Sequence, residues 1–393
     1  MKTSTGREKL IWIVCVVCTA VYFGACVYLF YNQTQYPTTG RFESDLPFHI
    51  SMAVDDRWYY SFTAFVYVWL YSFKIHDILI GIFLAAVTIA TIFVTYRIVT
   101  KLARKYEMQI SKPICYALAM ILNFVMAFYV PVVNHAHYIG YQSGNLWHNS
   151  TYLCMRLFGL LTISVFIDLV DKYKEGLKAG EWLVLSILMA VTTGIKPSFL
   201  LVFAPAVCIC LVVDLINHAK LSKVIIAALT VVPSVAIILW QNIVLFGNDT
   251  GNGFEINPFY TLSQRSEHAK VAVIISVLFP LLILIWHIRD FYKDKLYLGG
   301  IFVWLFGFAE VFLLSETGAR SKDGNFLWGY SIAIFVWFVV SVVRWVRDLK
   351  EISVTHKKVS IVYATLTGLV LAWQTVCGVY YFCLLLTGVT YFA

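Results

Sequence analysis

Long apolar runs separated by short polar segments recur along the whole chain. Most of these runs are about 18 residues or longer, which is the length that a helix needs to cross the hydrocarbon core of a bilayer. The runs predict eleven spans, at 10–31, 76–99, 113–133, 150–170, 181–194, 198–216, 224–246, 270–288, 296–314, 328–346 and 360–388. Residues 58–73 form an aromatic run too short to span, so we expect an interfacial or re-entrant helix there. The pattern therefore predicts an all-α polytopic membrane protein.

Composition agrees with this interpretation. Hydrophobic residues make up 60% of the 393 residues and the mean hydropathy is +0.77, whereas a soluble domain has an apolar content of about 45–50%. We expect a single transmembrane domain over residues 1–393, with a retained first span, because that run is longer than a signal-peptide core. The nine cysteines lie mostly in apolar runs without metal-ligand spacing, so they are expected to be buried small side chains.

Lysine and arginine are distributed unevenly among the polar segments. The chain has 30 Lys and Arg residues against 22 Asp and Glu residues. Most of the cationic residues fall in segments that would share a side with the N-terminus, and the positive-inside rule places such segments in the cytoplasm. We therefore expect a cytoplasmic N-terminus, an external C-terminus and a place in the plasma membrane. This explanation of the net charge of +8 leaves no reason to predict nucleic-acid binding.

The longer polar segments then fall on the outer side. The first external loop is predicted at 32–75, and further outer segments are 134–149, 247–268 and 315–330. The inner loops are short and mainly basic. We therefore expect any chemistry to face outward.

The first external loop contains an acidic passage, GRFESDLPFHISMAVDD. It places Glu43, Asp45, Asp55 and Asp56 within fourteen residues, with His49 one helical turn after Asp45. A carboxylate near the membrane surface can accept a proton from an attacking hydroxyl group. The sequence predicts Asp45 as a general base, helped by Glu43 or His49. The alternative is a solvated loop without chemistry, which applies most to the second pair of acids.

This passage resembles the acidic motif of the GT-C class of integral membrane glycosyltransferases. Glu43 and Asp45 match the Glu-x-Asp form of that motif, and Asp55 and Asp56 match the Asp-Asp form. The layout of spans, short inner loops and an interfacial helix is similar over most of the chain. The resemblance implies transfer of a sugar from a polyprenyl-phosphate or polyprenyl-diphosphate donor at the outer face. The partners would be that lipid-linked sugar donor, membrane lipids, and a glycan, lipid or protein acceptor.

Two later segments contain candidate ligands for such a donor. Lys196 lies in GIKPS between two apolar runs, where a cation needs water, headgroups or an anion. In SETGARSKDGNFLWGY, Arg320 suits a phosphate because its planar fork can donate two hydrogen bonds, while Asn325 and Trp328 suit a sugar. The alternatives are a lysine that reaches the interface and a plain surface loop.

Two charged residues fall inside predicted spans. Arg156 and Glu310 would each be costly alone in the membrane, so we expect them to pair and to shape the pocket. Just before Arg156, the segment GYQSGNLWHNST offers His148 and Asn149 for sugar or headgroup contacts, with helix capping by Asn149 as the alternative.

Other interpretations of the polar residues stay open. The four loop acids allow a divalent cation, Mg²⁺ or Mn²⁺, but no ligand spacing predicts a metal. Four histidines, His49, His135, His137 and His148, are an alternative metal set, again without spacing in its favour. Asn32, Asn149 and Asn248 each begin an N-x-Ser/Thr glycosylation pattern that is common by chance.

Two other functional classes compete with the transferase. A flippase or proton-coupled carrier would use Arg156 and Glu310, but it needs polar groups near the bilayer midplane, whereas most polar groups here lie on one side. We find no persuasive internal repeat, which also disfavours a transporter built from inverted repeats. A polysaccharide polymerase or ligase also handles a polyprenyl diphosphate outside the membrane. It often has one long external loop, whereas no external loop predicted here is longer than 32–75.

Overall fold

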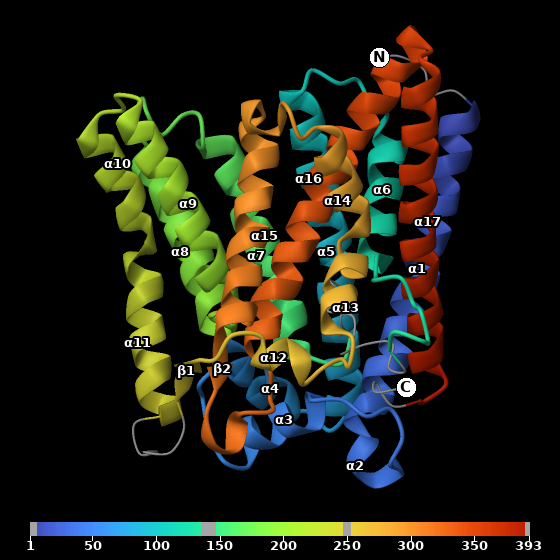
Figure 1. Ribbon diagram of the computed structural model, residues 1–393. Coiled ribbons are helices and arrows are strands. Elements are labelled where there is room, and N and C mark those ends of the chain that lie inside the picture. Colours follow the sequence, from blue (N-terminus) through green and yellow to red (C-terminus); the bar gives the residue numbers. More distant parts are fainter. Residues whose placement is uncertain (1–5, 135–146, 247–252, 390–393) are drawn as a thin grey trace.

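The computed structural model describes residues 6–134, 147–246 and 253–389, and these residues are almost wholly helical (Figure 1). The first part contains α1 (Gly6–Thr34), α2 (Tyr36–Thr39), α3 (Leu46–Val54), α4 (Phe62–Tyr71), α5 (His76–Lys105) and α6 (Lys112–Phe124). The second part contains α7 (Ser150–Leu169), α8 (Ala179–Ile195), α9 (Ser198–Ile216), α10 (Leu221–Ala228), the 3-10 helix η2 (Leu229–Val231) and α11 (Val232–Phe246).

The third part contains β1 (Phe254–Ile256), α12 (Tyr260–Ser263), α13 (Ala269–Ser276), α14 (Leu278–Trp286), η3 (Phe291–Lys293), α15 (Lys295–Leu313), β2 (Leu314–Glu316), η4 (Gly318–Arg320), α16 (Phe326–Thr355) and α17 (Lys358–Leu386). The two strands pair antiparallel, with Phe254 opposite Glu316 and Ile256 opposite Leu314.

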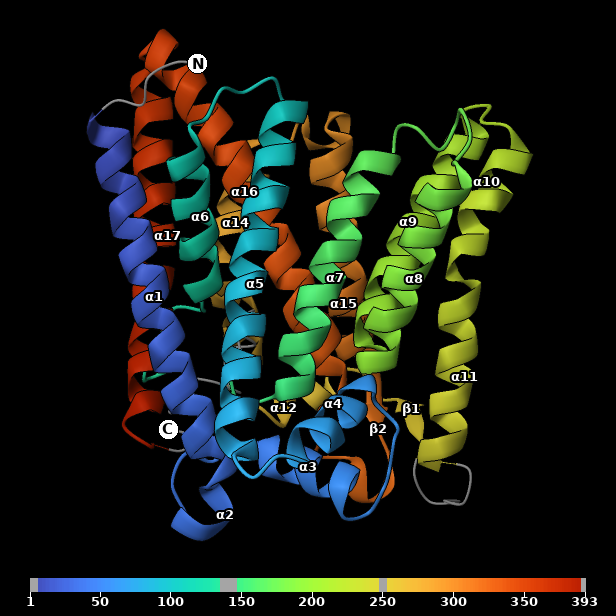
Figure 2. The same cartoon turned by 180° about the vertical axis from the view of Figure 1, so that it is seen from behind.

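The long helices support a polytopic membrane protein. Among the described residues, eight helices are long and apolar enough to cross a membrane, and the bent pair of α13 and α14 makes up to nine. The apolar helices α6 and α8 are shorter, yet they run parallel to the spans in both views (Figures 1 and 2). The chain enters α1 at one end of the bundle and leaves α17 at the other (Figure 1). An exact count of eleven crossings stays a prediction.

Helix α16 forms the centre of the bundle. In the most apolar 18-residue stretch of α16, 89% of the residues are buried in the protein. The corresponding share is only 17% in α1 and 22% in the α10–α11 segment. Exposed apolar faces of this kind suit contact with lipid tails rather than water. On the buried side, Gly307 of α15 brings that helix against α16, since an added Cβ would lie 2.6 Å from the Cβ of Ala333.

One predicted span, 113–133, is wrong as a continuous helix. Helix α6 ends at Phe124, and Val125 is already extended. The backbone of α17 approaches so closely that a Cβ added to Gly378 would lie 1.5 Å from the Phe124 carbonyl oxygen. The Met126 N–H then donates to the carbonyl of Gln374 at 3.0 Å. Backbone that leaves a helix at this depth is tolerated because protein groups replace its lost hydrogen bonds.

A second predicted span, 270–288, is also interrupted, because α13 and α14 meet at a bend of 68°. Pro280 lies in the first turn of α14, where it has no N–H to continue the ladder from α13. The amide of Gln374 satisfies the freed groups: it donates to the carbonyl of Ile275 at 3.2 Å and accepts from Phe279 N–H at 3.2 Å. The two interruptions therefore meet at one residue of α17, Gln374, through its backbone carbonyl and its side-chain amide.

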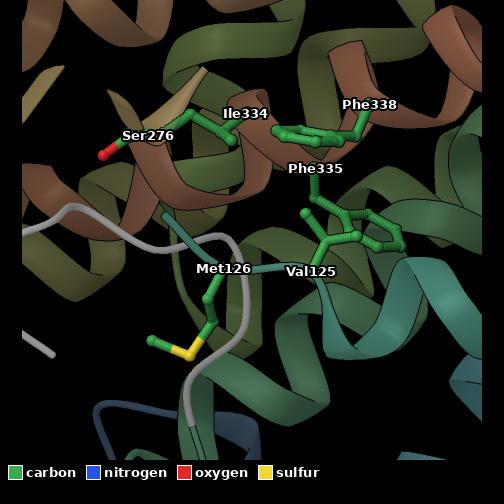
Figure 3. Close-up of a pocket in the computed structure, with 6 residues that line it drawn as sticks. All are labelled: Val125, Met126, Ser276, Ile334, Phe335 and Phe338. Carbon is green, nitrogen blue, oxygen red and sulfur yellow. The ribbon is translucent and has the colours of Figure 1, made fainter. Parts of the chain in front are cut away.

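A small apolar pocket lies beside these interruptions (Figure 3). Its lining residues come from the segment after α6, from α13 and from α16, and are Val125, Met126, Ser276, Ile334, Phe335 and Phe338. Arg156 reaches the same region, with its guanidinium 3.8 Å from the centre of the Phe335 ring.

The predicted first external loop folds into α2, α3 and α4, which lie across one end of the bundle together with α12 and the strand pair (Figures 1 and 2). Helix α4 has ten residues, so the aromatic run does form a short helix. Its capping residue Ser61 also donates to the Ile195 carbonyl at 2.7 Å. Gln241 of α11 donates to the carbonyls of Tyr60 and Gly194, at 3.0 and 3.1 Å. These bonds fix the loop against the turn between α8 and α9.

Candidate functional site

Asp45 is held by the segment that begins α7. Its backbone N–H donates to the carbonyl of His148 at 3.2 Å. Its Oδ2 accepts a 2.7 Å hydrogen bond from Nδ2 of Asn149 and lies 3.7 Å from Nε2 of His148. The Asp45 side chain is 36% exposed, so a substrate can still reach it. Asp45, His148 and Asn149, which the sequence offered as separate candidates, therefore lie together.

Asn149 serves two structures at once. Its Oδ1 accepts from the Tyr152 N–H and from the Thr151 hydroxyl, both at 2.8 Å, and so caps α7. Its Nδ2 remains free to donate to Asp45. Because the cap fixes the orientation of the amide, the donor is aimed at the carboxylate before any ligand arrives. Asn149 therefore caps α7 and also contacts Asp45, while its contact with a sugar or a headgroup stays a prediction.

Two histidines flank Asp45 and stay neutral near pH 7. Burial lowers the pKa of His49 to about 4, against the opposing effect of Asp45 and with a further lowering by Lys196. Burial likewise lowers the pKa of His148 to about 4, and Asp45 opposes that shift as well. Nδ1 of His49 lies 3.0 Å from the Tyr60 hydroxyl. Two neutral imidazole rings therefore lie beside the Asp45 carboxylate.

Lys196 reaches the same place from the turn between α8 and α9. Its Nζ lies 5.0 Å from the centre of the Trp328 ring and 3.4 Å from the Thr151 hydroxyl. Burial lowers the pKa of Lys196 to about 8, and Asp45 opposes that shift. The lysine is therefore half-buried over an aromatic ring, in electrostatic contact with the predicted base.

The segment after β2 forms a charged rim beside the site. Arg320 Nε lies 3.5 Å from Glu316 and 3.3 Å from Asp323. Asn325 donates its side-chain amide to both Glu316 oxygens at 3.0 Å. The charge of Arg320 contributes to the lowered pKa of Lys196, so the rim lies near that residue. The two rim carboxylates already compensate the charge of Arg320.

Two predicted sugar ligands have other roles. The Trp328 ring is 8% exposed, and His148 and Tyr152 pack against it with ring centres 5.4 and 5.2 Å away. The amide of Asn325 is committed to Glu316. Both side chains therefore have neighbours that the sequence does not reveal: Lys196 lies over the Trp328 ring, and Glu316 accepts from the Asn325 amide.

The predicted pair of Arg156 and Glu310 is absent from the described part of the chain. Arg156 donates to Oδ1 of Asn123 at 3.1 Å and stacks on Phe335, below the interrupted end of α6. Glu310 is buried against Gly329 of α16, and neither of its oxygens has a hydrogen-bond partner there. Arg156 belongs to α7 and Glu310 to α15, and a pattern of spans alone does not specify which side chains of two helices meet.

The other loop acids are less integrated. Glu43 makes no hydrogen bond or ion pair with a described residue, and Asp55 and Asp56 are exposed at the end of α3. Two glycosylation patterns are also explained otherwise: Asn149 is buried on Asp45, and Asn32 lies within α1, bonded to the Tyr28 carbonyl at 2.8 Å.

Sequence reasoning missed three residues of the site. Tyr60 and Thr151 contact His49 and Lys196, as described above, and Arg265, between α12 and α13, adds to the lowering of the His148 pKa. The segment of Arg265 was predicted to lie on the same side of the membrane as Asp45, but its position in a long polar segment gave no signal of this proximity.

Within the described ranges, no three His, Cys, Asp or Glu side chains lie close enough together to bind a metal ion. His135, His137 and Asn248 lie outside the described residues.

The arrangement combines an accessible carboxylate, two neutral imidazoles and a lysine at one end of the bundle. Chemically, it can take a proton from a hydroxyl group and stabilise an anion beside it. Comparison with known proteins adds no assignment: no protein-family model matches the chain, and no curated protein matches it.

Proposed function

We propose that the protein transfers a sugar from a polyprenyl-phosphate or polyprenyl-diphosphate donor to an acceptor hydroxyl group at the outer membrane face. The single observation that carries this proposal is the convergence of Asp45 and Lys196. They come from the first loop and from the α8–α9 turn, and both reach the start of α7, where Asp45 accepts from Asn149 at 2.7 Å and Nζ of Lys196 lies 3.4 Å from the Thr151 hydroxyl. An acid and a cation in one accessible site are the two groups that this reaction requires.

The chemistry assigns a role to each group. The acceptor oxygen attacks the anomeric carbon of the sugar, and its proton passes to Asp45. The bond between that carbon and the phosphate oxygen breaks, and the departing phosphate takes the bonding electrons. Lys196 stabilises the charge that develops on this oxygen. His49 and His148 stay neutral and surround the carboxylate, and Asn149 holds it in place.

Asp45→Asn tests the proposal directly. With purified protein and a labelled polyprenyl-linked sugar, we expect sugar release to fall by about two to four orders of magnitude, because a general base contributes that much to a rate. Asp56→Asn is the matched control: it removes an exposed acid from the same loop, and turnover should stay unchanged. Full turnover in D45N would disprove the assigned base.

A carrier is the second candidate, and one observation favours it. The interrupted end of α6 and the break between α13 and α14 meet at Gln374, and discontinuous helices of this kind commonly form substrate sites in transporters. Movement of a labelled polyprenyl-linked sugar across reconstituted vesicles separates the two functions. Loss of movement in Arg156→Gln, combined with unimpaired turnover in D45N, would favour the carrier.

A further inference from the structure

Arg265 is held by a backbone carbonyl of the charged rim that follows β2. It lies between α12 and α13 and is half-buried. Its Nη2 donates to the carbonyl oxygen of Lys322. Its guanidinium covers Gly324, where an added Cβ would lie 2.6 Å from Nη2 and 3.0 Å from Nε. Gly324 has a φ of +67°, so a glycine is favoured there for both space and backbone conformation.

The charge of Arg265 has no compensating carboxylate in the described part of the chain. No ion pair forms to it there, and its buried Nε–H has no acceptor among those residues. Arg320 differs in this respect, because it lies between Glu316 and Asp323. Leaving a guanidinium donor desolvated and unpaired is unfavourable, and an anion from a ligand would remove that cost.

The charge of Arg265 also acts on the site. Its positive charge acts on His148, as does that of Lys196, and both oppose protonation of the imidazole. Two cations from distant parts of the sequence therefore approach one histidine next to Asp45. Figure 1 shows α12, which precedes Arg265, at the same end of the bundle as α3 and α4.

We propose that Arg265 binds the phosphate of the polyprenyl carrier together with Lys196, an inference that rests on the proposed function. The guanidinium is held in place before the ligand arrives, and its planar fork matches phosphate oxygens. Arg265 thus supplies the arginine contact that sequence reasoning gave to Arg320, whose charge is already balanced by two carboxylates.

The test measures binding of three probes to the purified full-length protein: polyprenyl phosphate, the uncharged polyprenol and inorganic phosphate. Arg265→Gln should weaken binding of polyprenyl phosphate by about tenfold or more, the range for losing a hydrogen bond to a charged group, and leave polyprenol binding unchanged. Lys322→Gln is the matched control, because it removes an exposed cation of the rim and keeps the carbonyl that Arg265 uses. It should bind polyprenyl phosphate like the wild type.

Arg265→Lys keeps the charge without the planar fork, so its affinity should lie between those of R265Q and the wild type. Melting temperatures identify a variant that fails to fold. If R265Q is such a variant, binding by R265K is compared with binding by the wild type instead. If R265Q binds polyprenyl phosphate like the wild type, the inference fails while the proposed function stands. If the wild type binds polyprenol or inorganic phosphate as tightly as polyprenyl phosphate, the lipid-linked phosphate is the wrong ligand and both fail.

Discussion

Nδ2 of Asn149 donates a 2.7 Å hydrogen bond to Oδ2 of Asp45 while Oδ1 of the same amide caps α7. One side chain thus links the start of a membrane helix to the predicted catalytic base. A hydrogen bond to an ionised group contributes about 1.5–3 kcal/mol, more than an exposed polar contact does. This bond makes the orientation of Asp45 depend on the fold of α7.

Replacing Asn149 by Asp should separate the two roles. Aspartate is as good a helix cap as asparagine, so α7 should keep its stability. The new carboxylate has no donor for Asp45 and repels it, which favours protonation of the base. We expect sugar transfer to fall by about tenfold or more at neutral pH and to recover partly at higher pH, as a pH–rate profile would show.

Asn149→Ser is the matched variant, because serine also caps helices but adds no charge. It should lose the donor to Asp45 and retain an ordinary pH profile. If N149D and N149S had the same profile as the wild type, the bond to Asp45 would have no part in setting its basicity.

Binding of an anionic lipid should depend on the protonation of Lys196. Burial sets its pKa to about 8, so in the unliganded protein the ammonium form prevails below that pH and the neutral amine above it. Affinity for polyprenyl phosphate should therefore fall by about tenfold per unit once the pH exceeds this value. Lys196→Arg should remove the decline, because arginine stays protonated at all accessible pH values. Titrations of polyprenyl phosphate at pH values on both sides of this pKa test the prediction. An affinity that does not change with pH would contradict it.

Gly329→Ala should destabilise the junction of α15 and α16. A Cβ there would lie 2.4 Å from Oε2 of Glu310 and 3.1 Å from the Ser198 carbonyl oxygen. Overpacking of this kind costs about 1–3 kcal/mol. The melting temperature should fall, and the loss should be smaller in a double variant with Glu310→Ala, which removes the carboxylate from the collision.

Gly299→Ala in α15 is the control for this pair. Among the described residues, no atom of a neighbouring segment lies within 4 Å of a Cβ added at Gly299, so alanine should be neutral or stabilising through its higher helix propensity. Equal melting temperatures for G329A and G299A would show that Glu310 can move away from Gly329 without cost.

Gln374→Leu should weaken the packing of the interrupted helices. The change leaves the Phe279 N–H and the Ile275 carbonyl without their side-chain partner. Each buried polar group left unsatisfied costs about 1–3 kcal/mol. We expect a lower melting temperature than in Thr375→Val, a neighbouring change whose lost hydroxyl bonds only within α17, to the Leu371 carbonyl. Equal stability of the two variants would contradict this role of Gln374.

Arg344 should be the most sensitive position at the other end of the bundle. Its guanidinium lies 2.8 Å from Asp294, 3.4 Å from Asp290 and 3.9 Å from Asp348. Removing one partner from a buried charge network costs about 3–5 kcal/mol because like charges remain uncompensated. Arg344→Met should therefore lower the melting temperature strongly. Arg347→Met, three residues further along α16, removes an exposed arginine whose guanidinium lies 5.5 Å from the centre of the Tyr106 ring, and it should have a much smaller effect; a similar loss in both would show that only the net charge matters.

Local patterns predicted much of the architecture. The all-α membrane character follows from apolar runs long enough to span a bilayer, and the helix in the aromatic segment follows from its own composition. The break between α13 and α14 had a visible signal in Pro280. The end of α6 had none at Phe124, because it depends on the approach of α17 at Gly378.

The candidate site was predicted less completely, for a related reason. The sequence identified Asp45, His49, His148 and Lys196, all polar residues at the ends of apolar runs. It did not reveal that Trp328 is covered. It also could not distinguish Arg320, which nearby acids balance, from Arg265, which among the described residues bonds to a backbone carbonyl instead.

The sequence by itself determined that the chain partitions into a membrane and which polar residues remain at the ends of its helices, because transfer of side chains into an apolar phase is nearly additive along the chain. Only the tertiary structure decided which of those residues meet. Contacts such as that between Asn149 and Asp45 join segments far apart in sequence, and they depend on the packing and backbone geometry of the whole bundle.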